Sequence, residues 1–194
     1  MKVKLIYLIL FTEIVFGSGG YEIGTATGKG KFQLDLTWNP FGKFKYGQTY
    51  VVMNYGITKR FDIHGYISQH PGDYRTWYLG LFYQFLNMKK LHLATAVGVR
   101  RRFDKGWTNI FAPQLLYTGL ITERLYLGGS FVDVRNQSFD FSYGVAIDIG
   151  VFYKLKFETK LIESISIGMG GFHPATWNPS TYFLPTYSLD VKFK

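Results

Sequence analysis

The chain has 194 residues and a formal net charge of +9; 19% of the residues are aromatic and only 18% are charged, against about 25% charged in ordinary soluble domains. It contains no cysteine, which excludes disulfides, thiolate catalysis and cysteine-ligated zinc or iron–sulfur sites. The lysines and arginines form no dense basic helix and no nucleic-acid-binding motif, so we expect no nucleic-acid partner.

The N-terminus has the pattern of a secretory signal peptide over residues 1–20. Lys2 and Lys4 precede an apolar run at 5–16, and small residues follow at 17–20, where we expect cleavage. The run is shorter than the ~20 residues that a membrane-spanning helix needs. Glu13 interrupts it, and a buried N-terminal strand or helix is the alternative. We therefore predict export and a single mature domain over 21–194.

From residue 21 onward the sequence is a series of alternating runs with no sustained helical spacing. We predict ten strands, or eight if the first run and one other do not span a membrane. The first run is the weakest, because Gly28-Lys29-Gly30 could form a separate turn. The ten predicted strands cover residues 24–38, 48–58, 61–70, 76–86, 91–102, 108–121, 125–134, 139–153, 161–171 and 182–193.

The alternation separates a bulky apolar face from a face of small and charged residues. In the run 139–153, Ile147 and Ile149 flank Asp148, and Val145 precedes Ala146. The face of small and charged residues has too few polar groups to make a soluble outer surface, but its small side chains fit a crowded barrel interior. The bulky apolar face fits contact with lipid. The pattern predicts an all-β fold, a transmembrane antiparallel up-and-down barrel. The alternative is a soluble periplasmic lipocalin-like barrel that binds an apolar ligand inside.

The connections alternate in length, as in outer-membrane barrels with short periplasmic turns and longer outer loops. Tight turns are expected at 58–60, 87–90 and 122–124, and longer loops at 39–47, 70–75, 103–107 and 172–181. Two connections fit less well: 154–160 is long for a periplasmic turn, and 135–138 is short for an outer loop.

Two turn segments share a motif. Residues 56–65, GITKRFDIHG, match 119–129, GLITERLYLGG, and the chain ends in alternating Tyr187, Leu189, Val191 and Phe193. The motif resembles the hairpin turns of small Gram-negative outer-membrane barrels, including transporter-like barrels. The ending resembles the signal read by the barrel assembly machinery, although Lys194 follows the final Phe193. The resemblance implies an outer-membrane location and a porin-like transport role. It implies no catalytic residue.

The predicted interior carries charged residues in two layers. We expect Asp35, Arg100, Arg102 and Asp140 toward the outer rim, and Asp62, His64, His92, Asp148, Asp190 and Lys192 toward the periplasmic side. Opposite charges inside a narrow barrel should pair, since an unpaired buried charge is costly. The candidate site is therefore a lumen charge network of Asp35, Asp62, His64, His92, Arg100, Arg102, Asp140 and Asp148.

Three interpretations of the lumen remain open. The charges could plug it, or they could line a narrow conduit for a small solute, which small inward residues such as Gly80 and Gly98 favour. A rim enzyme that uses His70, Asp73, Asp140 or His173 is the least supported, and we expect neither catalytic activity nor a cofactor or metal. Basic residues near the outer rim could bind lipopolysaccharide phosphates: Lys43, Lys45, Arg75, Arg101, Lys105 and Arg135.

Overall fold

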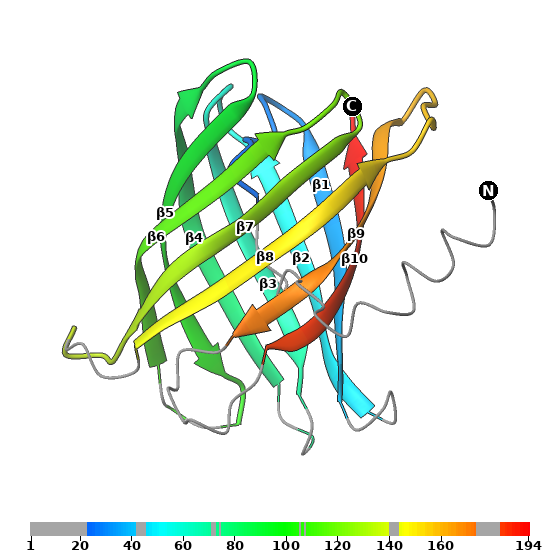
Figure 1. Cartoon of the computed structure of the whole chain (residues 1–194). Coiled ribbons are helices and arrows are strands. Elements are labelled where there is room, and N and C mark those ends of the chain that lie inside the picture. The colour runs from blue at the N-terminus through cyan, green and yellow to red at the C-terminus, as the bar shows by residue number, and fades with distance from the viewer. Residues whose placement is uncertain are drawn as a thin grey trace.

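The computed structural model describes residues 23–41, 46–70, 73, 75–104, 106, 108–139, 144–173 and 183–194. The proposed signal peptide and Asp140 lie outside these residues. Ten antiparallel strands form one closed barrel in the described part of the chain (Figure 1). They are β1 Phe32–Phe41, β2 Tyr46–Gly56, β3 Phe61–Gln69, β4 Arg75–Asn87, β5 Leu91–Arg102, β6 Thr108–Leu120, β7 Leu125–Arg135, β8 Gly144–Lys154, β9 Ile162–His173 and β10 Leu184–Phe193.

The barrel closes between its first and last strands. β1 pairs with β10 from Gln33–Lys192 to Trp38–Tyr187, and every other strand pairs with its neighbours in the sequence. Closure leaves no free edge with unpaired backbone groups. This confirms the predicted all-β barrel and its ten strands, and it rules out eight. No helix within the described ranges is long and apolar enough to cross a bilayer.

Alternation along each strand sends bulky apolar side chains outward. On β4, Leu79 is 57% exposed, while the next inward side chain, Phe82, is 1% exposed. The same division holds on β3, where Ile63 and Ile67 are exposed and His64 is buried. The outer surface is therefore apolar around the barrel wall, as the period-2 pattern predicts.

The two ends of the barrel differ. The turns at 57–60, 88–90 and 121–124 and the connection 155–161 lie at one end with the C-terminus, at the top of Figure 1. Two of the tight turns share one geometry: Thr58 Oγ1 accepts a hydrogen bond of 3.0 Å from the N–H of Phe61, and Thr122 Oγ1 accepts one of 2.9 Å from Leu125. The repeated motif thus marks hairpin turns. We call this the short-turn end.

Two predicted strand starts are wrong. The first strand was expected over 24–38 but begins at Phe32, because residues 23–31 enter the barrel instead of joining its wall. The eighth was expected from Phe139, but Phe139 has φ 66° and donates a 3.1 Å hydrogen bond to the carbonyl of Asn136 in a turn. β8 is described from Gly144. Alternating residues before a strand resemble the strand itself, so the pattern alone did not separate them.

Candidate functional site: the barrel lumen

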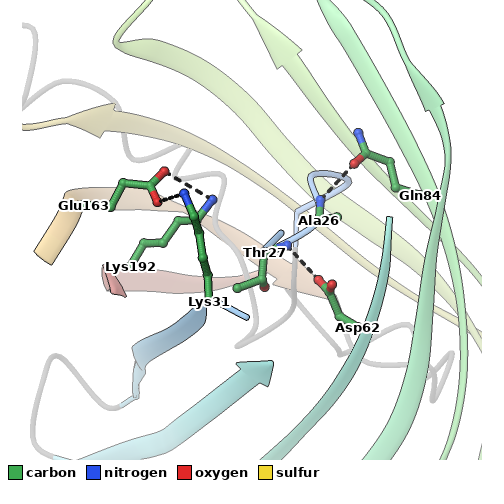
Figure 2. Close-up of polar contacts among 7 residues, drawn as sticks. All are labelled: Ala26, Thr27, Lys31, Asp62, Gln84, Glu163 and Lys192. Atoms are coloured by element: carbon green, nitrogen blue, oxygen red, sulfur yellow. Dashed lines mark hydrogen bonds and ion pairs between the residues drawn. The ribbon is translucent and has the colours of Figure 1, made fainter. Parts of the chain in front are cut away.

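Residues 23–31, here called the inner segment, run inside the barrel at its short-turn end. The backbone N–H of Thr27 donates a 2.7 Å hydrogen bond to Oδ2 of Asp62 on β3, and the N–H of Ala26 donates a 3.1 Å bond to Oε1 of Gln84 on β4 (Figure 2). In both bonds a main-chain N–H group of the segment donates to a side chain of the wall, so neither the N–H group nor the acceptor atom is buried without a partner. The wall side chains therefore hold the backbone of this segment.

Further contacts tie the segment to the next two strands of the wall. Thr25 Oγ1 lies 2.7 Å from Nδ1 of His92 on β5 and donates a 3.0 Å hydrogen bond to Thr118 on β6. The segment thus contacts β3, β4, β5 and β6. His92, predicted as part of a charge network, instead hydrogen-bonds to a threonine of the inner segment.

Small residues allow this close packing. A Cβ on Gly24 would lie 2.7 Å from Cα of Tyr117, and a Cβ on Gly56 would overlap the carbonyl oxygen of Gly28. Gly28 and Gly30 have φ of 91° and 74°, which favour glycine, and form the turn that leads into β1. The Gly28-Lys29-Gly30 stretch is therefore a turn, the alternative that the sequence left open.

An ion cluster lies where the segment joins the wall. Lys31 pairs with Glu163 of β9, and Lys192 of β10 lies 3.5 Å from the same carboxylate (Figure 2). Glu163 thus sits between two ammonium groups, one from the inner segment and one from β10. This cluster fixes the C-terminal end of the inner segment near the β1–β10 seam.

Aromatic side chains fill the lumen beyond the inner segment. Tyr78 stacks on Tyr66 and Phe111 at centroid distances of 5.2 and 5.4 Å, its hydroxyl lies 3.0 Å from Nε2 of His64, and Gln114 Nε2 donates a 2.7 Å bond to it. His64 is therefore part of an aromatic and hydrogen-bonded layer.

Glycines on the wall make room for these rings. A Cβ on either Gly80 or Gly98 would overlap Tyr78. Gly168 and Gly150 make room in the same way for Phe152, which stacks on Tyr126 at 5.1 Å. The small inward residues that suggested open space thus accommodate aromatic rings.

The acidic lumen residues are not held by the predicted ion pairs. Asp35 of β1 lies directly opposite Asp190 of β10, and Oδ1 of Asp35 accepts a 2.6 Å hydrogen bond from the hydroxyl of Thr37. Asp148 of β8 accepts 2.8 and 2.7 Å bonds from the N–H and Oγ of Ser130. Among the described residues, none of Asp35, Asp62, Asp148 and Asp190 forms an ion pair.

The predicted layers need one correction. Asp35 was expected toward the outer rim but sits at the level of Asp190, because β1 begins at Phe32 and Asp35 is near its short-turn end. Arg102, expected to face Asp35 or Asp140, pairs with Asp104 two residues further along. Arg100 places its guanidinium carbon 5.9 Å from the ring centroid of Phe111.

The other candidate groups each have their own surroundings. His70 is buried beside Ser68 and Thr76, with Nε2 at 2.8 and 3.2 Å from their hydroxyls. Asp73 is exposed, and His173 packs against Phe183 at 5.4 Å. The described residues hold no group of three or more His, Cys, Asp or Glu side chains that could bind a metal.

A cavity of about 180 Å³ lies between the inner segment and the wall near the short-turn end. Most of the residues that line it are polar, and Ile23, Ala26 and Leu120 add apolar surface. Sequence reasoning missed this cavity, since its residues come from the inner segment and from strands that only the closed barrel brings together. The polar lining residues are Thr25, Gln33, His92, Thr118, Glu123, Tyr126, Lys154, Ser164, Ser166, Asp190 and Lys192.

No family model and no curated protein matches the sequence. Among solved structures, the chain is similar to one described as "KdgM porin", with 7% sequence identity and a TM-score of 0.49 over 84% of this chain and 98% of that one.

Proposed function

We propose that this chain is an integral barrel of the outer membrane of a Gram-negative bacterium, exported by its signal peptide, and that it serves as a narrow channel for small polar solutes. The observation that carries the proposal is the division of the barrel wall. Large apolar side chains such as Leu79 and Phe131 are exposed on the outer face, whereas Asp148 and Asn54 are buried inside. Exposing so many large apolar side chains to water is unfavourable, whereas contact with the acyl chains of a lipid bilayer is not.

The same division weighs against the lipocalin-like alternative. A soluble barrel with an apolar ligand would carry its apolar face inside and its polar face outside. Here the inward face includes buried Asp62, Gln84 and Ser130.

The channel assignment is supported by the cavity at the short-turn end, whose lining residues are mostly polar. The aromatic layer and the inner segment restrict the remaining lumen, so a solute that crosses must be small, and the inner segment must shift to let it pass. The lumen contacts of His64 and His92, to Tyr78 and Thr25, support packing roles rather than a catalytic pair.

Several partners follow from this location. The outer face would contact lipid acyl chains, and exposed cations near the outer rim, such as Arg75 and Arg101, would meet lipopolysaccharide phosphates. The barrel assembly machinery would insert the chain through its C-terminal strand, β10.

Fractionation tests the membrane location. We expect the protein to be extracted only by detergent and to change its gel mobility on heating. Release into the soluble periplasmic fraction would contradict it and favour the lipocalin-like alternative.

Flux into liposomes tests the channel. Proteoliposomes should admit small polar solutes such as amino acids and exclude trisaccharides. Impermeable proteoliposomes that contain the heat-modifiable, folded barrel would contradict transport and leave a structural role.

A further inference from the structure

The cavity at the short-turn end is built from two rows of inward side chains across neighbouring strands. In one row Asp190 of β10 lies opposite Ser166 of β9, and Ser166 lies opposite Lys154 of β8. In the other, Lys192 lies opposite both Gln33 of β1 and Ser164 of β9. All six side chains line the cavity.

The first row has opposite charges at its two ends. Asp190 is 6% exposed, and its Oδ1 has no hydrogen-bond partner among the described residues. Lys154 forms no ion pair with any residue that the structure describes. A buried carboxylate oxygen without a partner is costly, and a charged donor from a ligand would satisfy it.

Asp190 and Lys154 form no ion pair with each other in the part of the chain that the structure describes. Strands lie about 4.8 Å apart, so two strands separate the Cα atoms of Asp190 and Lys154 by roughly 10 Å. Lys154 carries its ammonium group on a flexible four-carbon stem. Ser166 stands between Asp190 and Lys154 in this row, and Ser164 lines the same cavity in the other row.

We propose that this cavity binds a small zwitterionic solute of the amino-acid type, with its ammonium group at Asp190 and its carboxylate at Lys154. A carboxylate at Asp190 would carry the negative charge that matches one ammonium group. Serine hydroxyls donate to the carboxylate or accept from the ammonium group. Lys192 is shared with Glu163, which leaves Lys154 as the cation for the carboxylate.

This inference deepens the proposed channel function by naming a class of solute, but its test does not require conduction. The purified full barrel in detergent micelles is dialysed to equilibrium against radiolabelled alanine. Ethylammonium, which lacks the carboxylate, and propionate, which lacks the ammonium group, are the competitors. We expect saturable alanine binding, with each competitor at least about tenfold weaker, since each lacks one charge-assisted contact.

Two variants locate the site. Asp190→Asn and Lys154→Gln should each weaken alanine binding at least about tenfold. Lys156→Gln and Glu158→Gln, which change exposed charges on the neighbouring connection 155–161 outside the cavity, should bind as the unaltered chain does. A gel-mobility shift on heating shows that each variant is folded.

Three results would overturn the inference: no alanine binding by the folded barrel, ethylammonium or propionate competing as well as alanine does, or unchanged binding in the folded Lys154→Gln variant. Binding without flux in liposomes would sustain this site and refute the channel, whereas flux without binding would do the reverse.

Discussion

The N–H of Thr27 and the buried carboxylate of Asp62 are joined by a 2.7 Å hydrogen bond that places a stretch of main chain inside the barrel. A hydrogen bond to a charged group contributes roughly 1.5–3 kcal/mol, more than a neutral one. Since Asp62 faces the lumen from β3, this contact links the barrel wall to the element that narrows the lumen.

Thiol labelling tests whether the inner segment is held in place. The chain has no cysteine, so a single introduced thiol is unique. Ala26→Cys lies at a position that is 7% exposed and should react slowly with a maleimide, whereas Lys29→Cys, in the exposed turn, should react fast. Adding Asp62→Ala should speed labelling at position 26 several-fold and leave position 29 unchanged. Equal rates at both positions in the parent barrel would show that the segment is not buried.

The glycine at the end of β2 should be sensitive to a single methyl group. Gly56→Ala would drive a Cβ into the carbonyl oxygen of Gly28, so we expect a loss of about 1–3 kcal/mol in unfolding free energy. Gly119→Ala is the matched control, because a Cβ there meets nothing within 4 Å. Urea titration in detergent measures both variants, and equal midpoints for the two would contradict the packing of Gly28 against Gly56.

A charged side chain on the outer face should destabilise the barrel where that face contacts lipid. Leu81, 47% exposed in the middle of β4, faces the proposed bilayer, so Leu81→Arg should lower the unfolding free energy by about 2–4 kcal/mol. Met88 is also exposed but lies in the turn 88–90, so Met88→Arg should change the unfolding free energy little. The measurement is urea-induced unfolding in lipid vesicles. A tolerated arginine at position 81 would count against a lipid-facing wall.

His70, in the connection after β3, should stay neutral well into acid. Burial, with smaller contributions from Arg100 and Arg102, lowers the pKa of His70 from 6.5 to about 4. Between those values the unfolded chain binds a proton that the folded barrel does not, so stability is complete above pH 6.5 and falls as the pH drops toward 4.

NMR titration of the histidine rings and urea midpoints at several pH values check this. His70→Gln should reduce the loss of stability over that interval. A ring that titrates near its ordinary pKa of 6.5 would contradict the burial of His70.

Much of the wall could be predicted from the sequence, because side chains alternate strictly between two faces. Ile63 and Leu79 were expected outside and Asp62 inside, as found. Residues 24–27 could not be separated from a strand by the same rule, since Gly-Thr-Ala-Thr alternates small and polar residues whether it pairs in the wall or lies within the lumen.

Contacts across the β1–β10 seam were harder to predict. Asp35 and Asp190 are separated by almost the whole chain, and only the closing register brings them together. The same holds for Gly80 and Gly98: their small size indicated open space, but the ring of Tyr78 occupies it. Volume complementarity depends on which strands are neighbours, which local patterning does not encode.

Single-channel current in planar lipid bilayers tests the central claim most directly. The unaltered barrel should show small, infrequent conductance steps, because the inner segment restricts the lumen. The double variant Asp62→Ala, Gln84→Ala, which removes both side chains that hold the main chain of Ala26 and Thr27, should show steps several-fold larger or longer, while Glu158→Gln should match the unaltered barrel. Folded barrels that carry no current in either the unaltered or the doubly substituted form would contradict a channel restricted by the inner segment.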